Sequence, residues 1–542
     1  FMNEKLFGLL IIFLLLFPKL ATSQSFDSKV DSLYQVNSNQ PGFSIAVFKG
    51  GKIILEKQYG IANLNYNVPI TNQTVFDIGS IAKQFTAAAI LLLENEGKLS
   101  IKEPAYKYIN NLPRYKKGDP TIEHLLNQTS GIPEVDPYFF LTGLSFNDLL
   151  TQSRVSNIIV NLKELNFKPG DYYEYTNANY ILLANIIEAV SEKSFVEYLQ
   201  ENIFSPLKME STIKKNSTYT IIKNRAIGYI EDDGAYYKMH LHSAVYNGDG
   251  QIMTTSKDMF KWHQGIRNVT IGTPELWKKM HTKAKLNDGT IIDYGLGVEF
   301  ETHNGYSAMG FDGMIMGGFV SKYLYFPELD IAFFTTQNTF EEDFEERFFQ
   351  LVDLYITTKG QIYTNQEIEN VIIELLNDDL KKYEGNYIFL GNEYEDIRTG
   401  IIKLKENYLV LTTIDGEEIG KLEPIANQKF LMSGNIIEFD IQSSNKQYLF
   451  YANENEKPWL FKELKPYEYT ELELKELEGI YLNKSLQVAK EIKFEDGELQ
   501  LHYGKGAYSV ELEALSKDLF SIPNYPIQFL RNKSNKIISL KI

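Results

Sequence analysis

The stretch FDIGSIAKQFTAAAILLLENEGKL, residues 76–99, holds a serine, a lysine three places later and a long apolar segment. The pattern from Ser80 to Glu96 predicts a helix, and Gly97 after it is a typical C-terminal cap. Residues three apart on a helix share a face, so Ser80 and Lys83 are expected to lie side by side. Either they are two ordinary surface side chains, or they are a nucleophile with its base.

The chemistry of this pair depends on its surroundings. A serine hydroxyl is a weak nucleophile at neutral pH and needs a base within hydrogen-bonding reach. Lys83 can be that base only if its pKa falls, and both burial and the positive end of a helix favour the neutral amine. The same helix end would offer the backbone N–H of Ser80 to a developing oxyanion. The spacing alone is weak evidence, because Ser-x-x-Lys recurs at Ser205/Lys208, Ser211/Lys214 and Ser443/Lys446.

Only the first copy lies where a strand-like segment, VFDIG, meets a long apolar helix. This context resembles the active-site helix of the serine β-lactamase and penicillin-binding-protein superfamily, in the branch of class C β-lactamases, family VIII esterases and D-aminopeptidases. The similarity covers nearly all of residues 40–340, through TIEHLLNQTSGIP (121–133), the segment 167–209, GDGQIMTTSKDMFKW (248–262) and YGLGVEF (294–300). The resemblance implies an α/β (α+β) catalytic domain, with an antiparallel sheet flanked by helices, and an acyl-enzyme on Ser80.

The second motif of that branch, Tyr-x-Asn, corresponds to YTN at residues 175–177. The spacing is common in this chain, but only this copy lies between a Pro-Gly turn and an amphipathic helix. By resemblance, Tyr175 shuttles the proton between Ser80 and the leaving group, and Asn177 hydrogen-bonds Lys83 and the substrate. A phenol has a pKa of about 10, so we expect Lys83 beside it to favour the phenolate. The alternative is a loop aromatic that packs on the helix.

The third motif departs from the family pattern of Lys-Thr-Gly or His-x-Gly. The corresponding triplet is FDG at residues 311–313. Phenylalanine forms no hydrogen bond, so a substrate carboxylate would lose a partner there, which favours neutral esters or amides. By resemblance, Phe311 and Gly313 line the substrate, and the backbone N–H of Met314 completes the oxyanion hole. A rival triplet, HNG at residues 303–305, matches His-x-Gly, but Asn-Gly is typical of a hairpin turn and we favour the first assignment.

The character of the chain changes near residue 356, where a polar stretch interrupts the mixed helix and strand pattern. We expect a catalytic domain over 24–355, a linker over 356–378, and two small antiparallel β-barrel-like modules over 379–468 and 469–542. An internal repeat supports the modules: LKKYEGNY (380–387) matches LKELEGIY (474–481), and KLEPIANQKF (421–430) matches ELEALSKDLF (511–520). The alternative is one larger sheet whose halves look alike.

The composition of the chain argues against several classes of partner and cofactor. The net charge is −17 and no long basic run is present, which argues against nucleic acid. The chain has no cysteine, so disulfides and thiolate sites are excluded. Among the seven histidines only His240 and His242 lie close together, and we favour two solvated loop histidines over a metal site. We expect no metal and no organic cofactor.

The first residues are typical of an export signal. Lys5 precedes an apolar run over residues 6–17, and Ala21 and Ser23 fit the small-residue rule, so residues 1–23 are predicted to be a cleaved signal peptide. The run is shorter than the roughly 20 residues of a membrane-spanning helix. An uncleaved anchor is the alternative. We therefore expect a secreted or periplasmic protein without stable membrane insertion.

These features predict an exported serine hydrolase that cleaves an amide, peptide or ester bond in a small-molecule or peptide substrate. The resemblance implies an enzyme of the D-aminopeptidase, esterase or β-lactamase type. One alternative is a non-catalytic descendant that binds a ligand, for which Phe311 is the best evidence. The other is a cell-wall-binding protein that works through the β modules. The joint presence of Ser80, Lys83, Tyr175 and Asn177 favours catalysis.

Overall fold

The computed structural model describes residues 26–541 apart from short gaps. The residues left out within that range are 38, 143, 145–147, 233, 239–243, 341–342, 358, 360–374, 390–398, 414–417, 433–434, 441–446, 452–458, 466, 484–487, 504–507 and 523–524. The predicted signal peptide, His240, His242 and most of the predicted linker lie outside the described residues. Export and the linker therefore stay predictions.

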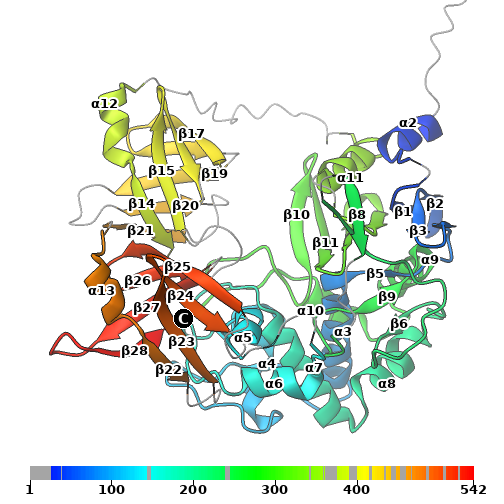
Figure 1. Cartoon of the computed structure of the whole chain (residues 1–542). Helices are drawn as coiled ribbons and strands as arrows, with labels where there is room; N and C mark the ends of the chain where they lie inside the picture. Colours follow the sequence, from blue (N-terminus) through cyan, green and yellow to red (C-terminus); the bar gives the residue numbers. More distant parts are fainter. Residues whose placement is uncertain are drawn as a thin grey trace, which may run out of the picture.

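A six-stranded antiparallel sheet organises the first part of the chain, in the order β10-β11-β12-β13-β1-β2 (Figure 1). Its strands are β1 (Phe43–Lys49), β2 (Lys52–Gln58), β10 (Glu299–His303), β11 (Tyr306–Ile315), β12 (Phe319–Phe326) and β13 (Ile331–Gln337). The early strand β1 pairs with the late strand β13, so that Phe43 lies opposite Gln337. Segments far apart in the chain therefore close one sheet.

The β1–β2 hairpin shows how local sequence builds this sheet. Gly50 and Gly51 have φ angles of 55° and 76°, which suit the tight turn between the two strands. Along β1, Ile45 packs into one hydrophobic cluster and its neighbour Ala46 into the other. The sheet is therefore covered on both faces, as successive side chains of a strand point to opposite sides.

Helices provide both covers (Figure 1). One face packs against α2 (Phe26–Leu33) and α11 (Phe344–Asp353). The larger cluster, on the other face, includes residues of α3 (Ala82–Asn95), α4 (Ile122–Leu126), α5 (Asp136–Leu141), α6 (Gln152–Ile159), α7 (Asn177–Ser191), α8 (Phe195–Leu199), α9 (Ser256–Arg267) and α10 (Pro274–Met280). Helix α3 is buried along most of its length. Among the described residues, no helix combines the length and the apolar character needed to span a bilayer.

Short elements complete this part of the chain. Two small hairpins pair β3 (Ile61–Asn63) with β4 (Val68–Pro69), and β7 (Tyr229–Asp232) with β8 (Ala235–Lys238). A three-stranded sheet has the order β5 (Phe76–Asp77), β9 (Ile252–Thr254), β6 (Ile213–Lys214). Single helical turns are η1 (Gly79–Ile81), η2 (Ala105–Lys107), η3 (Gln200–Phe204) and η4 (Pro327–Leu329). The three-stranded sheet matters most, because it sets the start of α3 beside two distant segments.

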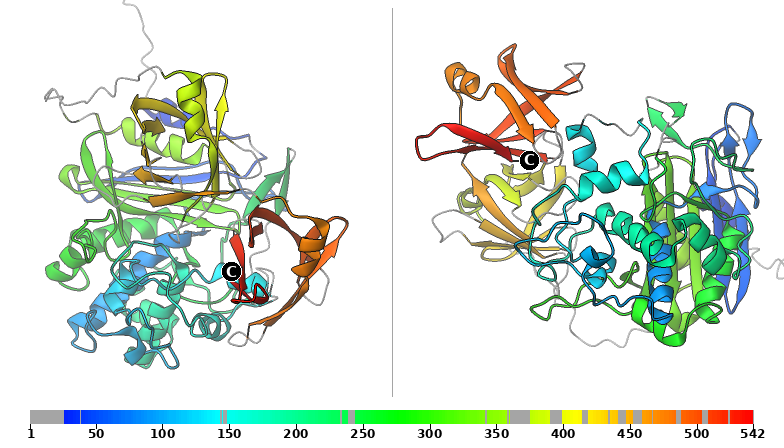
Figure 2. Two further views of the ribbon diagram at one scale, coloured as in Figure 1. Left: turned by 90° about the vertical axis from the view of Figure 1, so that its left-hand side faces the viewer. Right: turned by 90° about the horizontal axis from the view of Figure 1, so that it is seen from below.

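The last part of the chain forms two further antiparallel sheets. The first is a closed barrel of β14 (Gly385–Phe389), β15 (Thr399–Lys405), β16 (Tyr408–Thr412), β17 (Glu418–Ala426), β18 (Lys429–Met432), β19 (Asn435–Asp440), β20 (Gln447–Tyr451) and β21 (Trp459–Leu464). The second has seven strands, β22 (Gly479–Asn483), β23 (Val488–Glu495), β24 (Glu498–Tyr503), β25 (Tyr508–Ser516), β26 (Leu519–Ile522), β27 (Tyr525–Arg531) and β28 (Ile537–Lys541). Both lie on the side of α4, α5 and α6 (Figure 2).

The two units repeat one design in detail. Each opens with a short helical segment, α12 (Asn377–Leu380) with η5 (Lys381–Tyr383) in the first and α13 (Glu471–Glu476) in the second. In the first unit the Tyr387 hydroxyl donates to the Tyr383 carbonyl at 2.9 Å, and in the second the Tyr481 hydroxyl donates to the Leu477 carbonyl at 2.8 Å. The expected fold class, an α/β region followed by two barrel-like modules, is confirmed, and the alternative of one larger sheet is wrong. The exact domain boundaries stay a prediction.

Candidate active site

The turn that carries Ser80 is shaped by backbone packing. Strand β5 ends at Asp77, whose carboxylate accepts a hydrogen bond from the Gly79 N–H at 3.1 Å. Gly79 has a φ of 52°, and a Cβ there would lie 2.8 Å from the Met314 nitrogen. A side chain at this position would therefore clash with β11. Ser80 lies in η1, one turn before α3, so the helix predicted from Ser80 begins as a tighter turn and becomes α-helical at Ala82.

Lys83 binds three acceptors at the centre of the site. Its Nζ donates to Ser80 Oγ at 3.0 Å, to Asn177 Oδ1 at 2.8 Å and to the Asp249 carbonyl at 3.1 Å. The Lys83 side chain is fully buried. The amine therefore lies out of contact with solvent, directed at these three acceptors.

Burial also sets the charge of this amine. It lowers the pKa of Lys83 to about 8, against the opposing influence of the nearby carboxylates of Asp249 and Glu134. A useful fraction of Lys83 is thus uncharged near neutral pH, and the neutral amine can accept the Ser80 proton. This is the condition that the spacing of the two residues could not establish.

Tyr175 completes the contacts of the serine. Its hydroxyl donates to Ser80 Oγ at 2.7 Å, and the Lys83 Nζ lies 4.7 Å from the centre of its ring. Burial raises the pKa of Tyr175 well above its usual value. The expectation that Lys83 favours a phenolate is therefore wrong in this structure, because burial and the nearby carboxylates of Glu299, Asp249 and Glu134 all favour the neutral phenol. Tyr175 is a neutral hydrogen-bond donor.

Asn177 is placed by the start of helix α7. The Thr176 side chain caps that helix by accepting from the Ala178 N–H, and the Asn177 N–H donates to Glu134 Oε2 at 2.7 Å. These contacts aim the Asn177 amide oxygen at Lys83. Sequence analysis missed Glu134, since nothing around it distinguishes it from other loop carboxylates.

Strand β11 approaches the serine through a glycine. A Cβ on Gly313 would lie 2.0 Å from the Ile78 carbonyl oxygen and 3.3 Å from the Ser80 nitrogen. The following residue, Met314, is 65% exposed. Strand β11 therefore packs directly against the turn that carries Ser80, and the backbone nitrogens of Ser80 and Met314 lie on the two sides of this contact.

Phe311 lies beside this junction but is only 3% exposed. Its ring lies 6.2 Å from that of Tyr175 and 5.9 Å from that of Tyr294, measured between ring centres. At the position where the family pattern has Lys or His, this chain thus has a phenylalanine ring packed against two tyrosines. Phe311 supports the phenol of Tyr175 and offers no polar group to a substrate.

Truncation of Phe311 should affect both stability and catalysis. We expect Phe311→Ala to lower the free energy of unfolding by about 3–5 kcal/mol and to reduce kcat because Tyr175 loses its support. Phe430→Ala, which removes an equally buried ring from the distant barrel, is the matched control. Thermal unfolding and ester hydrolysis measured well below both melting temperatures separate the effects. Equal kcat in the two variants would contradict a role for Phe311 in positioning Tyr175.

The alternative triplet, HNG at residues 303–305, lies in a turn away from Ser80. Asn304 and Gly305, with φ of 52° and 77°, form the turn between β10 and β11. The His303 Nε2 lies 2.7 Å from Asp353 Oδ1, on helix α11. His303 is therefore held on the α11 side of the sheet, and the His-x-Gly match at residues 303–305 is a hairpin.

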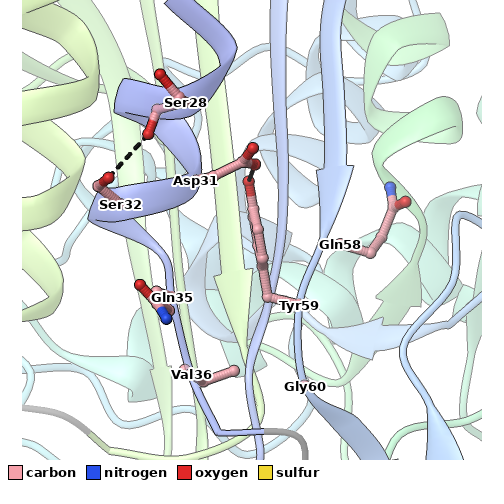
Figure 3. A pocket seen from close by; sticks show the side chains of 8 residues that line it. All are labelled: Ser28, Asp31, Ser32, Gln35, Val36, Gln58, Tyr59 and Gly60. Carbon is pink, nitrogen blue, oxygen red and sulfur yellow. Dashed lines mark hydrogen bonds between the residues drawn. The ribbon is translucent and has the colours of Figure 1, made fainter. Parts of the chain in front are cut away.

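A separate pocket lies between α2 and the end of β2 (Figure 3). It is lined by Ser28, Asp31, Ser32, Gln35, Val36, Gln58, Tyr59 and Gly60. The Tyr59 hydroxyl donates to Asp31 Oδ1 at 2.7 Å, and Ser32 Oγ donates to the Ser28 carbonyl at 2.8 Å. The pocket has the character of a polar surface recess.

Comparison with known proteins agrees with this geometry. The family described as Beta-lactamase matches residues 26–355. The D-aminopeptidase of Brucella anthropi is 28% identical over 277 residues, which cover 51% of this chain and 52% of that protein. The D-aminopeptidase of Brucella canis is 28% identical over 281 residues, 52% of this chain and 53% of that protein. The chain thus spans about half the length of the curated relatives it matches.

Solved structures show the same fold. The octameric penicillin-binding protein homologue from Pyrococcus abyssi has a TM-score of 0.55 and 24% identity, and the match covers 82% of this chain and all of that one. The penicillin binding protein from Bacillus halodurans has a TM-score of 0.51 and 25% identity, covering 58% of this chain and 95% of that one. The similarity to the first extends beyond the length of the α/β region.

Proposed function

Because this chain belongs to the beta-lactamase family, we propose that it is a serine hydrolase that forms an acyl-enzyme on Ser80. The observation that carries the proposal is one hydroxyl held by two proton-handling groups. Ser80 Oγ lies 3.0 Å from the Lys83 amine and 2.7 Å from the Tyr175 hydroxyl. A serine on the protein surface would not be hydrogen-bonded to a buried amine in this way.

The geometry supports a two-step reaction. Neutral Lys83 takes the proton of Ser80 as Oγ bonds to the substrate carbonyl carbon, and the backbone N–H groups of Ser80 and Met314 stabilise the resulting oxyanion. The bond to the leaving group then breaks. The leaving group takes a proton from Tyr175, which regains one from the Lys83 ammonium. Water hydrolyses the ester on Ser80 and releases the acid.

The substrate class follows from the relatives and from Phe311. The relatives named D-aminopeptidase support cleavage of an amide, a peptide or an ester bond, with D-amino-acid derivatives as the first choice. In this chain the third motif presents a buried aromatic ring where a cation or imidazole would meet a substrate carboxylate. We therefore propose substrates that are neutral at that end, and slow turnover of β-lactams, which carry a carboxylate.

Covalent labelling tests the proposal. A fluorophosphonate added to the full chain should give one adduct in the intact mass, mapped by peptide sequencing to Ser80. The adduct should be absent in Ser80→Ala and retained in Ser205→Ala, since Ser205 is the exposed serine of a second Ser-x-x-Lys. No mass gain in the wild type, or equal nitrophenyl-ester turnover by wild type and Ser80→Ala, would favour the non-catalytic binding alternative.

A further inference from the structure

The loop that supplies the third acceptor of Lys83 is itself held by a second buried lysine. Lys214 donates from Nζ to the Tyr246 carbonyl and to the Lys215 carbonyl, both at 2.9 Å. Its side chain is 1% exposed. Across the loop, the Thr86 hydroxyl donates to the Gly248 carbonyl at 2.6 Å. Contacts from β6 and α3 therefore hold the loop at Tyr246 and Gly248, directly before Asp249.

The Asp249 backbone carbonyl accepts from Lys83 at 3.1 Å, and the Asp249 side chain interacts electrostatically with both amines. It is 8% exposed, and its Oδ1 has no hydrogen-bond partner in the part of the chain that the structure describes. Burial raises the pKa of Asp249 to about 6, while Lys83 and Lys214 both favour its charged form. A buried carboxylate without a full set of hydrogen bonds is costly, so its place beside the base calls for a function.

Other ionisable groups face the same centre. The pKa of Lys83 responds to the charges of Asp249, Glu134, Glu299 and Asp136, and its amine lies near the rings of Tyr175 and Tyr180. The pKa of Asp249 responds to the charges of Lys83, Lys214 and Glu134. The pKa of Lys214 responds to the charges of Asp249, Asp77 and Lys215. Burial raises the pKa of Glu299 to about 8, so Glu299 is largely neutral near pH 7. Among the carboxylates, Asp249 has the largest influence on Lys83.

We propose that Asp249, with Lys214 behind it, is a positioning residue that acts through Lys83 by stabilising the ammonium formed when Lys83 takes the Ser80 proton. This inference rests on the proposed function. Burial alone would make Lys83 a weak base, since desolvation penalises the charged product of proton transfer. The Asp249 carboxylate opposes that penalty and keeps the basicity of Lys83 close to the working pH, where a general base is most effective.

The sign of the effect is specific. Lys83 must be neutral to act, so kcat/KM rises as pH rises through its pKa of about 8. Removing the negative charge at Asp249 lowers that pKa further, so the rise moves to lower pH. The plateau falls at the same time because a weaker base accepts the Ser80 proton less readily. A purely structural role would lower the rate at every pH without moving the rise.

The experiment is the pH profile of 4-nitrophenyl acetate hydrolysis by the full chain and by Asp249→Asn. We expect the acid side of the kcat/KM profile to move down by about one pH unit, the smallest shift typical of a neighbouring opposite charge, with a plateau several-fold lower. Asp258→Asn is the matched control, as Asp258 is also buried but accepts from the Ser211 N–H, the Thr212 hydroxyl and the Lys261 amine, away from Lys83. Its profile should keep the wild-type midpoint.

The outcomes are distinguishable. An unmoved midpoint in Asp249→Asn, with hydrolysis still dependent on Ser80, overturns the role of Asp249 and leaves the proposed function intact. Equal hydrolysis by wild type and Ser80→Ala overturns the proposed function. If circular dichroism shows that Asp249→Asn is unfolded, Asp249→Ala decides, because it removes the same charge without leaving a buried amide: its midpoint should also move down, and an unmoved one overturns the inference.

Discussion

Replacement of Lys83 by methionine should lower kcat/KM for ester or amide hydrolysis by about 10²- to 10⁴-fold, the range expected for loss of a general base. Methionine has a similar volume and no charge, so burying it at this fully buried position carries no desolvation penalty. The fold should therefore persist. The Ser80 hydroxyl would keep its contact with Tyr175, but that neutral phenol cannot take the proton. Steady-state kinetics with circular dichroism on the same samples checks this result.

The pH profile and one further variant sharpen the test. In the wild type, activity should rise with pH through about 8, because burial lowers the pKa of Lys83 to that value and only the neutral amine is a base. Lys83→Arg keeps a cation of similar length that stays protonated throughout this range. It should be as inactive as Lys83→Met, without recovery at high pH. Activity within tenfold of wild type in either variant would show that Lys83 is not the base.

Replacement of Gly313 by alanine should reduce kcat by about 10²- to 10³-fold, the effect of losing one oxyanion-hole donor. A Cβ at this position would lie 2.0 Å from the Ile78 carbonyl oxygen, so β11 must move away from the turn that carries Ser80. The backbone nitrogen of Met314 moves with it. Overpacking of this kind also destabilises, by about 1–3 kcal/mol. Kinetics and thermal unfolding measured together report both consequences.

Gly250→Ala is the control for this change. Gly250 lies near the same turn, but a Cβ there would be 3.8 Å from the Gly79 carbonyl oxygen, which is ordinary van der Waals contact. We expect kcat and the melting temperature of Gly250→Ala to stay close to those of the wild type. A Gly313→Ala variant that behaves the same way would show that β11 is not held against η1 as the structure describes.

Several features of the fold follow from short stretches of sequence. The turn at Gly50 and Gly51 is encoded by two glycines with positive φ, and the end of α3 by Gly97 with φ of 70°. The β modules are visible because the chain repeats itself, and the repeated tyrosines Tyr387 and Tyr481 make the same contact four residues back. Such features depend on backbone conformation and side-chain pattern over a few residues, which a single sequence displays.

The candidate site also contains some residues that the sequence predicts and others that it does not. Ser80 and Lys83 lie within one helical turn, so their proximity could be predicted from spacing alone. Asn177 and Tyr175 could be assigned only through family resemblance, and the structure places both against the pair. Asp249 was missed, because its only sequence signal is a place in a matched stretch that also contains Asp258. Contacts across a large sequence separation leave no local periodicity to find.

The sequence by itself determined the order of the elements, the repeat and the position of a serine one turn before a lysine. Tertiary structure alone decided the charge of the groups around that serine. It lowers the pKa of Lys83, raises that of Tyr175 and fills the Phe311 position with aromatic packing. The physical reason is that desolvation and Coulomb interactions sum over everything within reach of a group, and those neighbours come from distant parts of the chain.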